Sequence, residues 1–169
     1  MDKHALNKSL SPGGPHHLLS LLAGDWEGST LTWLEPGATA DEATQHGTFQ
    51  VIHSGWFVLH EYQSTFQGNR TTGMALLGYH LARKNFEMLW TDTFHMGTGM
   101  MLCRGEEMAR GFSVLGHYDS PVGGAQWGWR TQLELVDPNN MILSSWNIAP
   151  GHPEVKAVET AYTRVKAIS

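Results

Sequence analysis

Asp92 ends a stretch of alternating aromatic and apolar residues, and this combination is the clearest sign of a binding site in the sequence. A carboxylate on an apolar strand face lies at the rim of a pocket, pairs with a cation or is partly protonated. Arg104 or Arg130 is the expected partner. Two interpretations stay open: a polar anchor for a ligand, and a structural ion pair or strand-end turn contact. Because alternate residues of a strand share one face, the residues on this face are Phe86, Met88, Trp90, Asp92 and Phe94.

His60 and Tyr62 form a second candidate pair, on the strand predicted for residues 56–66. Both faces of this strand mix polar and apolar side chains, so the pattern does not decide which face is inward. If His60 and Tyr62 face inward, they place a titratable nitrogen and a phenol in an apolar cup. A structural or exposed histidine is the alternative. An enzyme, an isomerase or a hydrolase, would need Asp92 to converge with His60 or Glu61 as acid and base.

Aromatic residues on further strands complete the candidate site. Trp127 and Trp129 share one face and form a flat apolar wall, which suits a ligand pocket or a packed core. Residues 96–101 combine methionine and glycine, so they form either an adaptable lid or a plain hairpin. A binding function requires a lumen of about 300 Å3 or more. The residues expected to contact a small, largely apolar ligand are Trp90, Asp92, His60, Tyr62, Tyr79 and Trp129.

The sequence supports a metal site or a catalytic nucleophile less well than it supports a ligand pocket. The sequence contains no His-x-x-x-His or Cys-x-x-Cys motif, so no metal site or cofactor is expected. Haem or metal stays open as an alternative, because a single histidine aimed into the lumen would suffice for haem. Cys103 has no recognisable catalytic partner, and a buried, inert thiol is its expected state. The histidines that could converge from different strands are His53, His60, His80, His95 and His117.

The elements that position these residues are strands. About ten alternating segments follow one another at short intervals without intervening helices, which predicts an all-β domain. Closure into an up-and-down barrel would leave no exposed strand edges, and a sandwich is the alternative. One of the expected turns is Gly105-Glu106-Glu107. The predicted strands span residues 26–33, 48–53, 56–66, 74–81, 86–94, 100–104, 111–118, 126–136, 141–148 and 155–165.

The N-terminal region contains one helix signal. Pro15 suits a first helical position, the leucines from Leu18 to Leu22 make an apolar face, and Gly24 provides a stop. This short helix must pack on the barrel to be stable. Residues 1–14 are expected to form a flexible arm, and residues 15–169 a single barrel domain.

Two short motifs bracket the predicted barrel. Gly24-Asp25-Trp26 begins the first strand, and Tyr162-Thr163-Arg164 lies in the last one. The pair resembles the barrel-closing motif of lipocalins, in which an arginine lies over the indole. The resemblance implies that Trp26 and Arg164 close the barrel by a cation–π contact. The alternative is that Tyr162 and Arg164 face the lumen and bind an anionic group.

Interior segments narrow the resemblance. They are LAGDWEG (22–28), GWFVLHEY (55–62), LGYH (77–80), WTD (90–92) and YTR (162–164). They resemble bacterial calycin-like proteins of domain-of-unknown-function family 1579. His80 departs from the pattern, which has an acidic residue there. This resemblance implies the fold and a lumen, and it brings no established catalytic residues.

Composition limits the partners. The net charge is −5 and the pI is about 6.0, which argues against nucleic acid. No apolar run is long enough to span a membrane, and the first residues lack a secretory signal. With a single cysteine, a cytoplasmic location is expected. A homodimer is a further expectation if the barrel is filled and its outer face is apolar, which would make the protein an interaction module.

Overall fold

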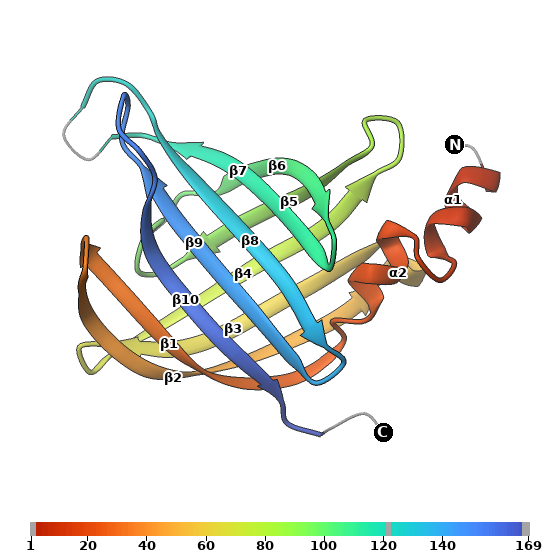
Figure 1. Ribbon diagram of the computed structural model, residues 1–169, viewed down its shortest axis with the longest axis horizontal. Helices are drawn as coiled ribbons and strands as arrows, with labels where there is room; N and C mark the ends of the chain where they lie inside the picture. The colour runs from red at the N-terminus through yellow and green to blue at the C-terminus, as the bar shows by residue number, and fades with distance from the viewer. Residues whose placement is uncertain (1–2, 121–122, 167–169) are drawn as a thin grey trace.

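A computed structural model describes residues 3–120 and 123–166 of the chain (Figure 1). The described residues form ten antiparallel strands that close into one barrel. The prediction of a closed up-and-down barrel is therefore confirmed. Residues 1–2 and 167–169, the outer ends of the expected arm and domain, lie outside the described residues. The strands are β1 Gly24–Glu35, β2 Ala38–Ile52, β3 Phe57–Phe66, β4 Asn69–His80, β5 Asn85–Asp92, β6 Met101–Met108, β7 Gly111–Tyr118, β8 Trp127–Asp137, β9 Asn140–Ile148 and β10 Val155–Arg164.

The barrel closes where β1 pairs with β10, in a register that sets Trp26 opposite Arg164. The guanidinium carbon of Arg164 lies 4.1 Å from the centre of the Trp26 ring. The same guanidinium donates hydrogen bonds to the carbonyl oxygens of Leu21, Ala23 and Pro138. A Cβ at Gly24 would lie 2.7 Å from Arg164 Nη1, so glycine is required beside the guanidinium. Arg164 thus ties the two ends of the sheet to the helical segment.

Three strands, β2, β4 and β6, extend by four or more residues beyond their predicted limits; β4 begins at Asn69, five residues before its expected start at residue 74. β2 begins at Ala38, ten residues before its expected start at Thr48. Its polar first half pairs with β1, and its second half, from His46 on, pairs with both β1 and β3. β6 continues through Gly105 to Glu107, which had been expected to form a turn. A Cβ at Gly105 would lie 1.8 Å from the Ser113 carbonyl oxygen. The glycine therefore permits close strand approach and does not make a turn there.

Two helices cover one end of the barrel (Figure 1). Helix α2 spans Pro15–Ser20, as the proline predicts, and α1 spans Lys3–Leu10. Helix α1 was not expected from the sequence, because Lys3–Leu10 lies within the segment predicted to be an arm. The Ser9 hydroxyl and His16 Nδ1, 2.6 Å apart, hydrogen-bond the two helices together. No helix within residues 3–120 and 123–166 is long and apolar enough to cross a membrane.

Candidate functional site

The barrel encloses a cavity of about 90 Å3. The expected lumen of about 300 Å3 or more is not present, because side chains from the wall and from one loop fill most of it. The apolar lining includes Phe49, Leu77, Met88, Trp90, Trp129 and Leu133. The polar lining includes Thr30, Gln45, Thr131, Ser145 and Thr160.

The cavity brings together most of the residues chosen from the sequence. His60, Tyr62, Trp90, Asp92 and Trp129 all line it. The two indoles are stacked, with centres 5.4 Å apart and planes 15° from parallel. Trp90 Nε1 donates a hydrogen bond of 2.9 Å to the Tyr62 hydroxyl. Three aromatic side chains from β3, β5 and β8 therefore form one wall of the lumen.

Tyr79 is not part of this site. It belongs to a separate hollow of about 480 Å3 between the helices and the barrel. Its ring packs against His16 and Phe86, with ring centres 5.9 and 5.1 Å apart. Tyr79 shares the face of β4 that carries the buried Leu77, but a shared face does not determine how far along the barrel axis a residue lies.

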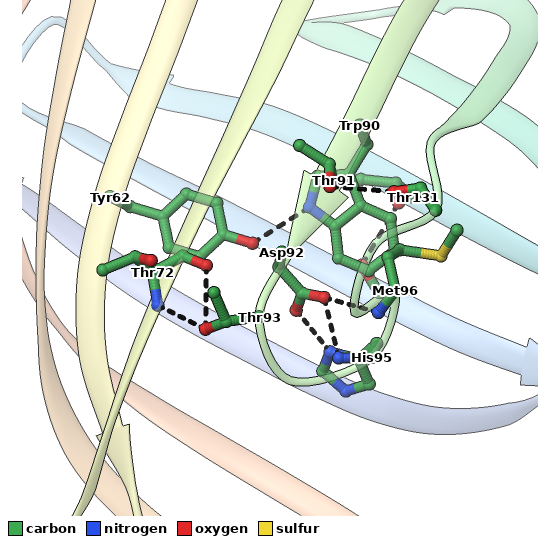
Figure 2. A network of polar contacts seen from close by, with 11 residues as sticks. Tyr62, Thr72, Trp90, Thr91, Asp92, Thr93, His95, Met96 and Thr131 are labelled. Carbon is green, nitrogen blue, oxygen red and sulfur yellow. Dashed lines mark hydrogen bonds and ion pairs between the residues drawn. The ribbon is translucent and has the colours of Figure 1, made fainter.

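Asp92 anchors the loop that follows β5 (Figure 2). Its Oδ1 accepts hydrogen bonds from the backbone N–H groups of His95 and Met96, at 2.7 and 2.8 Å. Its Oδ2 lies 2.7 Å from His95 Nδ1. The expected arginine partners are wrong: Arg104 pairs with Glu87 at 2.8 Å, and Arg130 pairs with Glu154 at 2.7 Å. The carboxylate is a strand-end turn contact, one of the two interpretations that the sequence left open.

The anchored loop, residues 93–100, folds over the mouth of the barrel. The His95 ring lies against both indoles, with its centre 5.8 Å from that of Trp90 and 5.0 Å from that of Trp129. Phe94 stacks on Phe66 of the neighbouring hairpin at 4.3 Å. We call residues 93–100 the mouth loop. Phe94 and His95 of this loop fill part of the lumen that the sequence-based prediction expected to be open.

His60 is buried in the wall and is neutral at physiological pH. It stacks on Phe49 with ring centres 3.9 Å apart, and its Nε2 lies 3.4 Å from the Tyr162 hydroxyl. Desolvation by burial lowers the pKa of His60 to about 3. Tyr162, in turn, accepts a 2.5 Å hydrogen bond from Gln45 Nε2. Tyr162 therefore belongs to an internal polar network. Its motif neighbour Arg164 lies where β1 meets β10, beside the carbonyl groups of Leu21 and Ala23.

The geometry does not assemble the acid–base pair expected from the sequence, which was Asp92 with His60 or Glu61. Glu61 is exposed and lies between the inward-facing His60 and Tyr62, so its side chain is on the outer face. The pairing of Asp92 with Glu61 is therefore wrong. Asp92 shares the lumen with His60, but its hydrogen bonds go to the mouth loop. Burial also raises the pKa of the Cys103 thiol to about 12, which makes it a poor nucleophile.

The low pKa of His60 makes a testable contribution to stability. Between about pH 3 and the ordinary value near 6.5, the unfolded chain binds a proton that the folded chain does not. The free energy of unfolding therefore falls as the pH is lowered through this window, and His60 contributes no such slope above it. From pH 7 to pH 5 the loss due to His60 is expected to be about 2 kcal/mol.

Urea unfolding at the two pH values measures this loss. His60→Phe keeps a ring against Phe49 but cannot titrate, so its stability should fall by about 2 kcal/mol less than that of the unsubstituted protein. His16, whose pKa burial also lowers, adds to the slope in both proteins and cancels in the comparison. Equal losses in both proteins would show that His60 is not held neutral by the fold.

Several lumen residues were missed by the sequence-based prediction. Thr30 and Thr160 share a 2.7 Å hydrogen bond, and Thr131 and Ser145 lie 3.2 Å apart. Gln45 was missed because the first half of β2 was not recognised as a strand. The alternation of Gln45, Gly47 and Phe49 along β2 is the signal that could have identified it.

The described residues contain no group of three or more histidine, cysteine, aspartate or glutamate side chains placed to hold a metal ion. Haem would need one histidine that can reach an iron in the lumen. His60 is packed between Phe49 and Tyr62, and the cavity of about 90 Å3 is far smaller than a porphyrin ring. The geometry therefore supplies no reason to favour a metal or haem over an organic ligand.

A closed ten-stranded meander, with a helix before the first strand and an arginine over the first-strand tryptophan, defines a calycin-like barrel. The chain belongs to the family described as "Protein of unknown function (DUF1579)", whose model matches residues 11–164. No curated protein matches the chain.

Two solved structures share the fold. The crystal structure of Rv2717c from M. tuberculosis has a TM-score of 0.59 and 14% identity, over 94% of this chain and 98% of that one. The S-type phycobiliprotein lyase CPES from Guillardia theta has a TM-score of 0.61 and 8% identity, over 99% of this chain and 100% of that one. At these identities the likeness shows the barrel alone.

Proposed function

We propose that the protein binds a small, neutral, largely apolar molecule in the barrel lumen, beneath the mouth loop. The observation that carries this proposal is the composition of the cavity wall. Stacked indoles form one side, hydroxyl groups are scattered over the other, and no lysine or arginine is among the described residues that line the cavity. An anion would therefore be buried without a counter-charge, which is costly.

The cavity falls short of the volume of about 300 Å3 expected of a preformed binding site, so binding requires the mouth loop to open, and the volume of the cavity restricts the size of the ligand. A cavity of about 150 Å3 can hold benzene, whereas this cavity measures about 90 Å3. A six-membered ring can therefore enter only if the mouth loop moves. The His95 ring contacts Trp90 and Trp129, and its Nδ1 lies 2.7 Å from Asp92 Oδ2. An entering aromatic molecule replaces this ring against the indoles and breaks its contact with Asp92. The proposed ligand is thus a single flat ring, or a longer molecule that inserts one ring.

Three probes of matched shape test the proposal: toluene, benzoate and benzylammonium. Isothermal titration calorimetry at pH 7 is expected to give a Kd below about 1 mM for toluene. The two ions should bind at least about tenfold more weakly, because the lumen offers neither a free cation nor a free carboxylate to pair with them. Tight binding of benzoate, or no binding of toluene, would contradict the proposal.

A further inference from the structure

The indole N–H of Trp129 is a buried hydrogen-bond donor that has no partner within residues 3–120 and 123–166. The side chain is only 5% exposed and lines the lumen cavity. Other buried tryptophans of the barrel are satisfied: Trp26 Nε1 donates to the Leu22 carbonyl oxygen at 2.8 Å, and Trp90 Nε1 donates to Tyr62. Because buried donors in native proteins are nearly always paired, the exception at Trp129 requires an explanation.

Tyr62 presents a second donor beside the same wall. Its hydroxyl oxygen accepts the hydrogen bond from Trp90 (Figure 2), and within the described part of the chain this is its only hydrogen bond. Its own O–H is therefore not committed to an acceptor of the protein. The nearby Asp92 carboxylate is already engaged by the backbone N–H groups of His95 and Met96. Burial raises the pKa of Tyr62, so the phenol keeps this proton.

Both donors flank Trp90. The Tyr62 hydroxyl is 2.9 Å from Trp90 Nε1, and the Trp129 ring is stacked on the Trp90 ring. A flat molecule that replaces His95 against the indoles would lie in the cavity that both Tyr62 and Trp129 line. The complementary group is a hydrogen-bond acceptor without charge, since the wall contains no cation.

We infer that the ligand of this lumen is an aromatic or conjugated molecule with a neutral carbonyl group, or an equivalent acceptor, that takes the N–H of Trp129. The inference rests on the proposed binding function and specifies the chemical class of the ligand. Tyr62 is the second donor available to the same acceptor. Hydrocarbons fit the wall but leave the Trp129 N–H unpaired, so they bind more weakly.

Acetophenone and α-methylstyrene form a matched pair of probes, because the carbonyl oxygen of the first is replaced by a methylene group in the second. Acetophenone is expected to bind about tenfold more tightly, since pairing an otherwise unsatisfied buried donor has an effect of that order. In 1H–15N spectra of the indole groups, acetophenone should shift the Trp129 N–H proton downfield, and α-methylstyrene should not.

Trp129→Phe keeps an aromatic ring and removes the donor. In this variant the preference for acetophenone should fall to within about twofold. Trp33→Phe is the control, because Trp33 lies on the outer wall near Lys156, and it should keep the tenfold preference. The Trp129 signal is assigned by its absence from the Trp129→Phe spectrum. If that variant does not fold, single Trp→Phe variants at the other tryptophans assign the Trp129 signal by elimination, and its shift in the unsubstituted protein with acetophenone provides the test.

Equal affinity for the two probes, or a preference that survives in Trp129→Phe, would overturn the inference and leave the proposed function intact. Failure of both probes, together with toluene, to bind would instead refute the proposed function itself. A downfield shift of the Trp129 proton with acetophenone alone supports the assignment of the acceptor to this donor.

Discussion

Arg164→Ala is expected to lower the free energy of unfolding by about 3 kcal/mol, one of the two largest effects expected here. The guanidinium donates to three carbonyl oxygens, those of Leu21, Ala23 and Pro138. It also covers the indole of Trp26 at 4.1 Å. Truncation to alanine removes the cation–π contact and leaves some of the three carbonyl oxygens buried without a hydrogen-bond donor. Urea unfolding followed by far-ultraviolet circular dichroism measures the change.

Arg70→Ala is the matched control. Arg70 is exposed and donates a 3.0 Å hydrogen bond to Gln63, so its removal should cost less than about 1 kcal/mol. Arg164→Lys should fall between the two, because lysine keeps the charge but cannot donate in three fixed directions. If Arg164→Ala and Arg70→Ala were equally stable, the barrel would not depend on this contact for closure.

The fold could be predicted from the sequence because its signals are local. The glycine before Trp26 and the arginine at position 164 mark the two strands that meet. Alternation identified the inward faces of β5 and β8 correctly. Polar segments were harder to recognise, as the early half of β2 shows: Thr44 and His46 alternate with buried Gln45 and Gly47, and the first large apolar residue on this face is Phe49. The alternation that ends at Phe49 is therefore the only local sign of the strand within this segment.

The site could be predicted only in part, for a physical reason that differs between residues. Five of the six chosen residues line the lumen. Alternation along β5 and β8 predicted the face of Trp90, Asp92 and Trp129, whereas the mixed faces of β3 left the side of His60 and Tyr62 undecided. Tyr79 fails because the same pattern contains no information about depth along the barrel. The partners of Asp92 lie three and four residues later, in a loop whose path depends on the packing of His95 against both indoles. The small volume of the cavity follows from that same loop.

The location of the ligand is the central claim, and filling the cavity is the most direct way to test it. Ala75 is buried, lines the cavity, and lies between His60 and Trp90 in the sheet register. Ala75→Leu adds three carbon atoms to a space of about 90 Å3. The added side chain can occupy the cavity with a change in stability below about 2 kcal/mol. Thermal unfolding verifies that the variant is folded, and Ala75→Val provides a smaller step.

Ala161→Leu is the matched control, because Ala161 is exposed on the outer face of β10. The deciding measurement is the calorimetric Kd of toluene for the unsubstituted protein and these two variants. Ala75→Leu is expected to weaken binding at least about thirtyfold, since the ring and the new side chain compete for one space. Ala161→Leu is expected to leave the Kd unchanged. Unchanged toluene binding by a folded Ala75→Leu variant would show that the ligand does not occupy the lumen.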